Sequence, residues 1–275
     1  MRAIDDPAYI LNDEILYVPD GRLPGSFLIS WYLDRGTMPI LYGDILMGNR
    51  WPRPVSVMVS YKNTIPPQVA TELQAYDISQ LYRSNRPQCL PAKVNCVQVK
   101  HSKKTEKFLS DIQKAIGSTL TKGDLWFRGL GRDALILSLA FFIPIINPNT
   151  YDNEFGPGIY TTNDFEYAAS YCPPEGVLMV FKDPDLRSLK VWEPTIDEWK
   201  HLVANWLKLP LSNIIIPEKY KDADIIRGPI STILSLGKKQ LHFPKQGSQQ
   251  QMVAVSYDGC KALTASLHTI IFSER

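Results

Sequence analysis

The sequence predicts an α+β fold in which a β-sheet is flanked by helices. Strand-like runs rich in β-branched and aromatic residues recur along the chain, and amphipathic segments with helical spacing lie between them. The chain has 275 residues, of which 44% are hydrophobic, so it can bury a sizeable core. This length favours one large domain, or one domain with an extension.

The N-terminal hundred residues combine turn signals with short apolar runs. The runs at 26–33, 54–61 and 93–100 predict strands, and the last two alternate in polarity as half-buried strands do. The segment at 66–84 instead predicts a helix, because it begins with prolines and then carries apolar residues at helical spacing. This part of the chain matches no motif to which we can assign a function.

The basic stretch "KHSKKTEK" at 100–107 marks a predicted domain boundary. The formal charge of the whole chain is only +2, so we interpret the stretch as a solvated linker or helix edge in preference to a nucleic-acid site. We therefore expect an N-terminal α/β domain or extension of unknown role at 1–104. The main domain is expected at 105–275.

The main domain alternates predicted strands with predicted helices. Strands are expected at 124–130, 176–183, 223–230 and 251–257. Helices are expected at 105–120 and 197–209, together with a short helix beginning near Asp164 and a closing helix or helical turn at 258–267.

Membrane association and export are not predicted. The longest apolar run, at 134–146, is too short to span a bilayer and is interrupted by Pro144. The N-terminus carries acidic residues where a signal peptide would need a basic start. We therefore expect an intracellular protein, either cytoplasmic or nuclear.

Several kinds of chemistry lack their sequence signals. The cysteines are scattered and no histidine lies at zinc-finger spacing from them, so we expect free thiols and no metal site; they are Cys89, Cys96, Cys172 and Cys260. The four histidines are dispersed, and there is no nucleophile elbow, Walker loop or Rossmann glycine fingerprint. A hydrolase triad and a nucleotide-binding loop of these types are therefore not expected.

Three segments of the main domain stand out. The predicted strand "DLWFRGL" carries Arg128 and Gly129 near its end, and "FGPGIYTTNDFEYAASYC" places a glycine-rich turn before Tyr160 and a short helix. The third segment consists of "DADIIRGPIS", which contains Gly228-Pro229, and the later strand "QQQMVAV". Taken singly, each has a structural explanation: Arg128 could form a salt bridge at a strand end, and threonine hydroxyls could cap the helix.

Together the three segments resemble the ADP-ribosyltransferase superfamily, over about residues 120 to 272. The resemblance implies a split antiparallel β-sheet with flanking helices, and it implies NAD as the substrate. In the superfamily the active site is assembled from three strand positions that are far apart in sequence.

The resemblance also implies roles for individual residues. Arg128 stands where other members carry histidine or arginine, and it would anchor NAD, with Gly129 allowing the ligand close to the backbone. Tyr160 and Tyr171 would enclose the nicotinamide ring, because aromatic faces attract a planar cation. The list of expected contacts is completed by Gly158 in the turn and by Thr161, which would brace the site.

The catalytic position departs from the family pattern. Most transferases of the superfamily have glutamate at the start of the late strand, where it binds a ribose hydroxyl and stabilises the cationic transition state. This chain has Gln251 there, or Gln250 after a shift of one residue, and no acidic residue lies between Asp224 and Asp258. A neutral amide can accept the ribose hydrogen bond but lacks the charge, so we expect a slower reaction.

The sequence therefore predicts an NAD-dependent mono-ADP-ribosyltransferase with Arg128, Tyr160 and Gln251 as its catalytic residues. A protein is the expected acceptor, and a nucleic-acid acceptor stays open. The alternatives are a catalytically weak or inactive binding module with the same fold, or an NAD glycohydrolase. The sequence does not predict the oligomeric state.

Overall fold

The computed structural model describes most of the chain beyond residue 69. The described residues are 69–78, 90–102, 104–117, 123–132, 135, 154–156, 158–207, 209–232, 244 and 247–274, together with three short strands nearer the N-terminus. These strands are β1 (Tyr9–Leu11), β2 (Glu14–Leu16) and β3 (Val57–Met58), which form a small antiparallel sheet. The strand expected at 26–33 and the apolar run at 134–146, apart from Leu135, lie outside the described residues.

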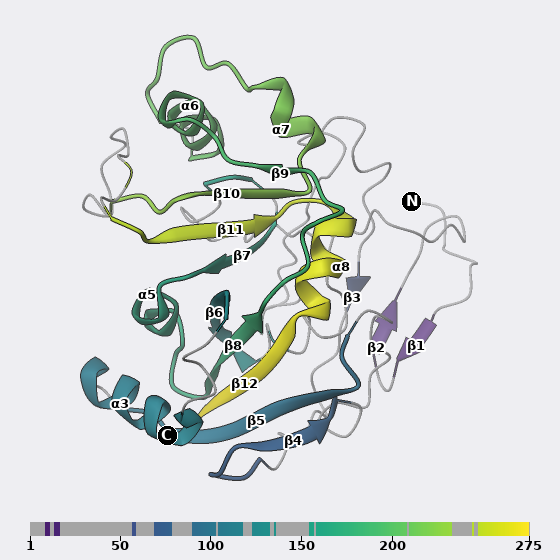
Figure 1. The fold of residues 1–275 in the computed structure, drawn as a ribbon, viewed down its shortest axis with the longest axis vertical. Helices are drawn as coiled ribbons and strands as arrows, with labels where there is room; N and C mark the ends of the chain where they lie inside the picture. Colours follow the sequence, from purple (N-terminus) through teal and green to yellow (C-terminus); the bar gives the residue numbers. More distant parts are fainter. Residues whose placement is uncertain are drawn as a thin grey trace.

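A nine-stranded sheet organises the described residues (Figure 1), in the order β4-β5-β12-β8-β6-β7-β11-β10-β9. Its strands are β4 (Gln74–Asp77), β5 (Lys93–Lys100), β6 (Leu125–Gly131), β7 (Ile159–Thr162), β8 (Gly176–Lys182), β9 (Val191–Trp192), β10 (Ile225–Pro229), β11 (Gln250–Ala254) and β12 (Leu267–Glu274). Neighbouring strands are antiparallel except for the pairs β5–β12 and β9–β10. The predicted α+β fold is confirmed.

The sheet is weakly joined at its centre, between β6 and β7. These strands share a single residue pair, Phe127 with Thr162, whereas β6 pairs with β8 along its whole length. Strand β7 likewise pairs along its whole length with β11. Figure 1 shows β7, β11 and β10 lying together above, while β8, β12 and β5 slope away beneath them. After Phe127, therefore, the residues of β6 no longer pair with β7.

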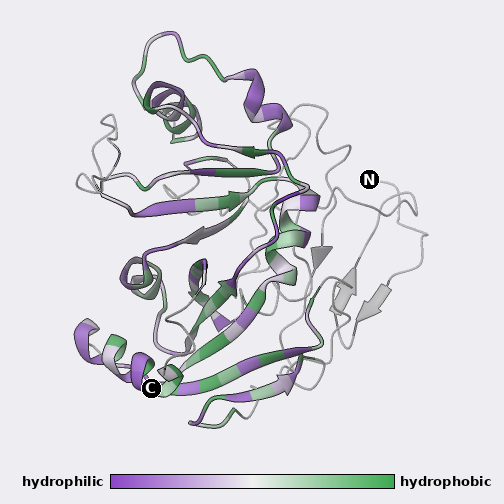
Figure 2. Ribbon diagram, in the orientation of Figure 1, coloured by the Kyte–Doolittle hydropathy of each residue, from purple (hydrophilic) through white to green (hydrophobic). Residues whose placement is uncertain are grey.

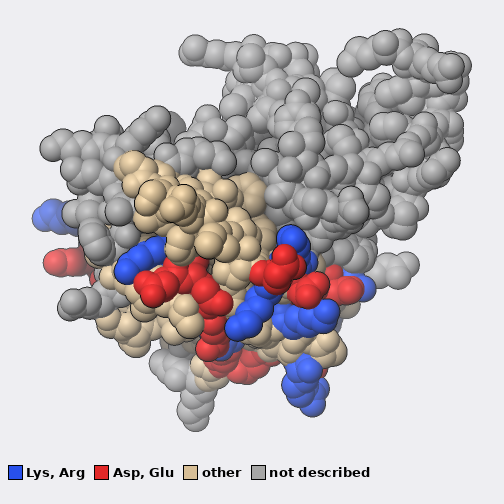
Figure 3. Space-filling model, turned by 90° about the horizontal axis from the view of Figure 1, so that it is seen from above, with Lys and Arg blue, Asp and Glu red and all other residues tan. Residues whose placement is uncertain are grey.

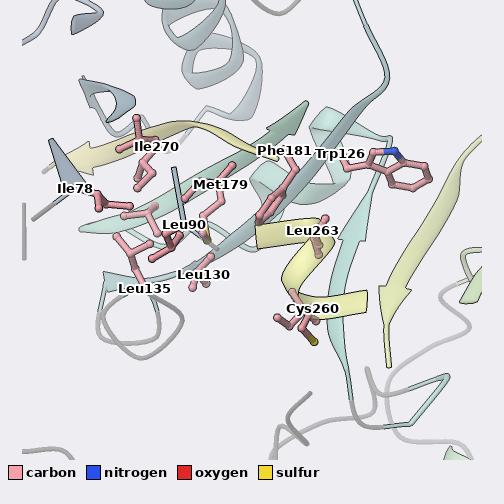
Figure 4. Packing of buried hydrophobic residues seen from close by; sticks show 14 of the residues in the cluster. Ile78, Leu90, Trp126, Leu130, Leu135, Met179, Phe181, Cys260, Leu263 and Ile270 are labelled. Atoms are coloured by element: carbon pink, nitrogen blue, oxygen red, sulfur yellow. The ribbon is translucent and has the colours of Figure 1, made fainter. Parts of the chain in front are cut away.

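Helix α8 (Tyr257–Ala265) covers one face of the sheet. Its buried Cys260 and Leu263 pack against residues that alternate along β6 and β8, among them Trp126, Met179 and Phe181 (Figure 4). Alternate residues of a strand point to opposite faces, so this set defines the α8 face.

The other helices cover the opposite face in two groups. Helix α3 (Thr105–Ile116) and the short α5 (Phe165–Ser170) pack with Phe127 on the β6 side. Helix α6 (Ile196–Leu207) and α7 (Glu218–Asp222) pack on β10 and β11, where Trp199 contacts the cluster that contains Ile226 and Val253. Figure 2 shows the apolar colour concentrated in the inner strands and polar colour on α3 and α7.

Most elements predicted for the main domain are confirmed. Strands β6, β8, β10 and β11 and helices α3, α5, α6 and α8 lie within one to four residues of the expected ends. Strand β5 has the expected bounds, and β3 lies inside the run at 54–61.

Three predictions differ from the structure. Residues 74–77 of the expected helix at 66–84 form β4, because pairing with β5 overrides the helical spacing. Strand β12 was not predicted, although it lies between β5 and β8. The boundary expected at residue 104 runs through one core, since Val97 of β5 packs with Phe108 of α3.

Gly129 provides a test of how closely α5 packs on the sheet. A Cβ atom there would overlap the carbonyl oxygen of Ala168. We expect Gly129→Ala to lower the free energy of unfolding by about 2 kcal/mol, measured by denaturant titration. Gly131→Ala in the same strand is the control, because its Cβ would meet nothing within 4 Å. Equal stability of the two variants would contradict this packing.

Candidate functional site

The turn before β7 packs tightly onto the α6 side of the sheet. Phe155 is fully buried, and a Cβ on Gly228 would lie 3.0 Å from its ring. Gly156 has a φ of +84°, and a side chain there would overlap the ring of Trp206. A side chain on Gly158 would overlap Val253. Protein atoms thus fill the space beside both glycines of the turn, where the sequence analysis expected a ligand.

Tyr160 holds this turn in place. Its hydroxyl donates to the carbonyl oxygen of Gly156 at 2.7 Å and accepts from the backbone N–H of Phe155 at 2.9 Å. Its half-buried ring packs against the α6 cluster. A second tyrosine, Tyr220 of α7, donates to the Phe155 carbonyl at 3.3 Å. The hydroxyl of Tyr160 is therefore used within the protein, which the sequence did not indicate.

Gln251 lies on the same face as Tyr160. Its register partners are Thr162 on β7 and Gly228 on β10, and the alternation of β11 places Gln250 on the other face. Of the two glutamines that the sequence left open, Gln251 is therefore the one beside Tyr160.

The Gln251 side chain forms a buried polar pair with Glu154. Gln251 and Glu154 are 7% and 8% exposed, and Nε2 of Gln251 donates to Oε2 of Glu154 at 2.5 Å. The same nitrogen donates to the Pro229 carbonyl at 3.2 Å. Sequence reasoning missed Glu154, because it considered acidic residues only near Gln251 in the chain. The turn that carries Glu154 was recognised only for its glycines and Tyr160.

The two threonines of β7 stabilise the junction with β11. The hydroxyl of Thr161 donates to the Met252 carbonyl at 2.8 Å, and that of Thr162 donates to the Gln250 carbonyl at 2.9 Å. The cap of α5 is Asp164, whose carboxylate accepts from the Tyr167 N–H at 3.0 Å. The threonines thus brace β7 on β11 and leave the capping of the helix to Asp164.

Tyr171 lies at the end of α5, next to Gly129. A Cβ on Gly129 would lie 3.1 Å from the backbone of Tyr171, whose side chain is 41% exposed. The Tyr171 ring meets that of Tyr167 edge to face at 5.2 Å, and the two hydroxyls are 2.9 Å apart. Tyr171 is accessible for stacking, and Tyr167 is an aromatic neighbour that the sequence analysis did not identify.

Arg128 points to the α8 face, opposite to Gln251. Its neighbours on that face are Trp126 and Leu130, both in the α8 core. Arg128 is half-buried, and the loss of water around its guanidinium lowers the pKa of Arg128 to about 10, an effect partly offset by Cys260. No hydrogen bond or ion pair joins it to the described residues, so the salt bridge considered from the sequence is absent there.

A partly desolvated guanidinium with no counter-ion in the described part of the chain favours the binding of an anion. Arg227 of β10 offers a contrast on the same face of the sheet. It lies 5.3 Å from the ring centroid of Trp126 and 3.7 Å from a carboxylate oxygen of Glu193. Within the described residues, Arg128 is therefore the better candidate for an anion ligand.

The structure brings the predicted residues together in three places. Gln251, Tyr160 and the Thr162 backbone share one face, together with Glu154. Gly129 and Tyr171 meet where α5 crosses β6. Arg128 lies on the far face of β6, directly after the residue pair at which β6 and β7 separate.

Other chemistry has little support among the described residues. The described cysteines are free, and burial raises the pKa of Cys96 and of Cys172 to about 12, which makes both poor nucleophiles. No three His, Cys, Asp or Glu side chains within the described ranges are grouped as metal ligands would be. No helix described is long and apolar enough to cross a membrane.

Charged side chains of both signs mingle on the face above α6 and α7 (Figure 3). Three ion pairs form there, with N–O distances of 3.0 to 3.9 Å: Lys221–Glu218, Lys200–Asp197 and Lys219–Glu198. A surface of balanced charge does not generate the positive field that attracts nucleic acid.

No model of a known protein family matches the chain, and no curated protein matches it. The functional assignment therefore depends on the three motifs and on the geometry described above.

The role of Tyr160 in the turn can be tested by removing its hydroxyl. We expect Tyr160→Phe to lower the free energy of unfolding by about 1–2 kcal/mol, since the N–H of Phe155 then loses its partner. Tyr171→Phe is the control, because its hydroxyl is exposed, and it should cost less than about 0.5 kcal/mol. Equal losses in denaturant titration would show that Tyr160 does not hold the turn.

Proposed function

We propose that this chain binds NAD and transfers its ADP-ribosyl group to a protein acceptor. The observation that carries the proposal is the meeting of three motifs that are far apart in sequence. Strands β6, β7 and β11, which hold Arg128, Tyr160 and Gln251, are consecutive in the sheet. Such an assembly is what the resemblance to the ADP-ribosyltransferases implies.

The separation of β6 from β7 supports a binding site at their junction. Beyond the pair of Phe127 with Thr162, backbone groups on the facing edges have no partner in the strand ladder. An amide such as the carboxamide of nicotinamide has both a donor and an acceptor to satisfy such groups. Gly129 lies two residues beyond this pair on β6, where its lack of a side chain allows the end of α5 to pack closely beside the junction.

The side chains around the junction suit the two ends of NAD. The nicotinamide ring of NAD is a planar cation, and the exposed ring of Tyr171 offers it a face. The pyrophosphate is an anion, and the guanidinium of Arg128, which has no ion pair with a described residue, offers it a counter-charge. A ribose hydroxyl between these ends needs an acceptor, which Gln251 can supply.

The reaction breaks the bond between ribose C1′ and the nicotinamide nitrogen. The bonding electron pair leaves with nicotinamide, which becomes neutral, and positive charge develops on the ribose. A lone pair of the acceptor forms the new bond to C1′, and the proton of that nucleophile passes to solvent. With water as acceptor the same step is NAD hydrolysis.

A binding module without turnover is the second candidate. The neutral side chain of Gln251 favours it, because a carboxylate at this position would stabilise the cationic transition state. Incubation with labelled NAD separates the two functions. Nicotinamide release with labelling of a protein acceptor supports transfer, and NAD binding with neither product supports the module.

We expect Tyr171→Ala to weaken NAD binding by about 1–2 kcal/mol in isothermal titration calorimetry, since stacking on the ring is lost. The side chain is exposed, so the variant should unfold at nearly the wild-type temperature. Ile215→Ala is the control, because Ile215 is 69% exposed and lies away from the three motifs. Wild-type affinity in the Tyr171 variant would remove its stacking role.

Arg128→Met tests whether an unpaired cation is retained for a ligand. We expect it to abolish measurable NAD binding while leaving the free energy of unfolding within about 1 kcal/mol of wild type or above it, because a partly buried charge is removed. Arg132→Met is the control. It breaks the 2.5 Å ion pair with Glu274, so it should cost about 1 kcal/mol of stability and preserve NAD affinity. Unchanged NAD affinity in Arg128→Met would contradict the assignment.

A further inference from the structure

The amide of Gln251 is held in one orientation. Its two hydrogen bonds with described residues both leave from Nε2, and both partners, the Glu154 carboxyl and the Pro229 carbonyl, are acceptors. An amide oxygen could not donate to these two acceptors. The two partners therefore determine which atom of the amide is Nε2 and which is Oε1. Oε1 has no hydrogen-bond partner among the described residues, and it is not one of their fully buried unpartnered atoms. The side chain therefore presents an oxygen acceptor.

The Pro229 carbonyl is itself fixed. It also accepts from the indole Nε1 of Trp199, a fully buried residue of α6, at 3.0 Å. Both hydrogens of the Gln251 amide thus meet acceptors that belong to rigid, packed parts of the fold.

In its ionised form, the Glu154 carboxyl places a negative charge beside Gln251, where most members of the resembled superfamily carry a glutamate. A carboxylate that accepts from the N–H of an amide polarises that amide and makes its oxygen more negative, an effect strengthened in a buried environment. The charge reaches Gln251 from a different segment of the chain, 97 positions away.

The turn is built so that Glu154 stays in place. The next residue, Phe155, is fully buried, and its backbone bonds to Tyr160 and Tyr220 on either side. The backbone next to Glu154 is therefore fixed, so less chain entropy is lost when Glu154 binds Gln251.

We propose that Glu154 is a positioning residue that supplies, through the Gln251 amide, the negative charge that stabilises the cationic ribose in the transition state. The proposal depends on the proposed function, in which Oε1 of Gln251 accepts a ribose hydroxyl. Most members of the resembled superfamily carry a single glutamate that both binds the ribose hydroxyl and supplies the charge. In this chain Gln251 would bind the hydroxyl and Glu154 would supply the charge. In this role Glu154 acts on the substrate through Gln251.

The test is a charge exchange within the pair. Glu154→Gln retains an oxygen acceptor for Nε2 of Gln251 but removes the charge. Its kcat for nicotinamide release from NAD should fall about tenfold to hundredfold, while KM changes less than threefold and the unfolding temperature is nearly unchanged. Gln251→Glu alone brings two carboxyl groups into contact and should lose both stability and activity.

The double variant Glu154→Gln/Gln251→Glu restores one carboxyl and one amide in exchanged positions. We expect the kcat of the double variant to be at least tenfold higher than that of Glu154→Gln. A purely structural role for Glu154 would instead change the unfolding temperature without a separate loss of kcat, and would give no recovery.

The controls separate the two proposals. Wild-type kcat in a well-folded Glu154→Gln variant, with NAD turned over normally, overturns the role of Glu154 and leaves the proposed function standing. A wild-type protein that neither binds NAD in calorimetry nor releases nicotinamide overturns the proposed function, and the role of Glu154 with it. If NAD binds without turnover, equal affinities for wild type and Glu154→Gln also overturn the role of Glu154.

Discussion

The hydrogen bond between Glu154 and Gln251 is the interaction on which the site depends. Both side chains are buried beside an apolar cluster, where an unpaired polar group would cost free energy. The pair is satisfied because the turn before β7 carries Glu154 to β11, and that turn fits because its glycines allow close packing on α6. The glycines, the Tyr160 hydroxyl and the buried Phe155 therefore serve one arrangement.

The candidate site lies where the sheet divides into two parts, between β6 and β7. β7, β11, β10 and β9 form one part, closed by α6 and α7, and the remaining strands form the other. A single residue pair joins the parts. Tyr171 and Gly129 come from the second part and Gln251 from the first, so the proposed substrate would contact both. Arg128 is half-buried and has no ion-pair partner among the described residues, which leaves its guanidinium able to bind an anion.

Much of the fold could be predicted, because strands such as β6 and β8 have strong local patterns. β4 could not, because a four-residue strand with helical spacing is determined by its pairing with β5. β12 was missed although it is strongly apolar, since it follows α8 at once, and the sequence analysis ended its last element within that region.

The site was predictable in part, for a similar reason. Motifs indicated which strands carry Arg128, Tyr160 and Gln251, and the strand order then brings them together. Motifs could not indicate Glu154, because its partner is distant in the chain and only the folded turn joins the two. Nor could they show that Arg128 faces α8, which depends on the register of β6 against β8.

The most direct test is a crystal structure of the protein with a non-hydrolysable NAD analogue, in which the distance from Oε1 of Gln251 to the nearest ribose hydroxyl is measured. The account predicts a hydrogen bond of about 2.6–3.2 Å, with Nε2 still bound to Glu154 and the nicotinamide ring on Tyr171. An analogue bound elsewhere, or a ribose bound by Nε2 after the pair with Glu154 has broken, would contradict it.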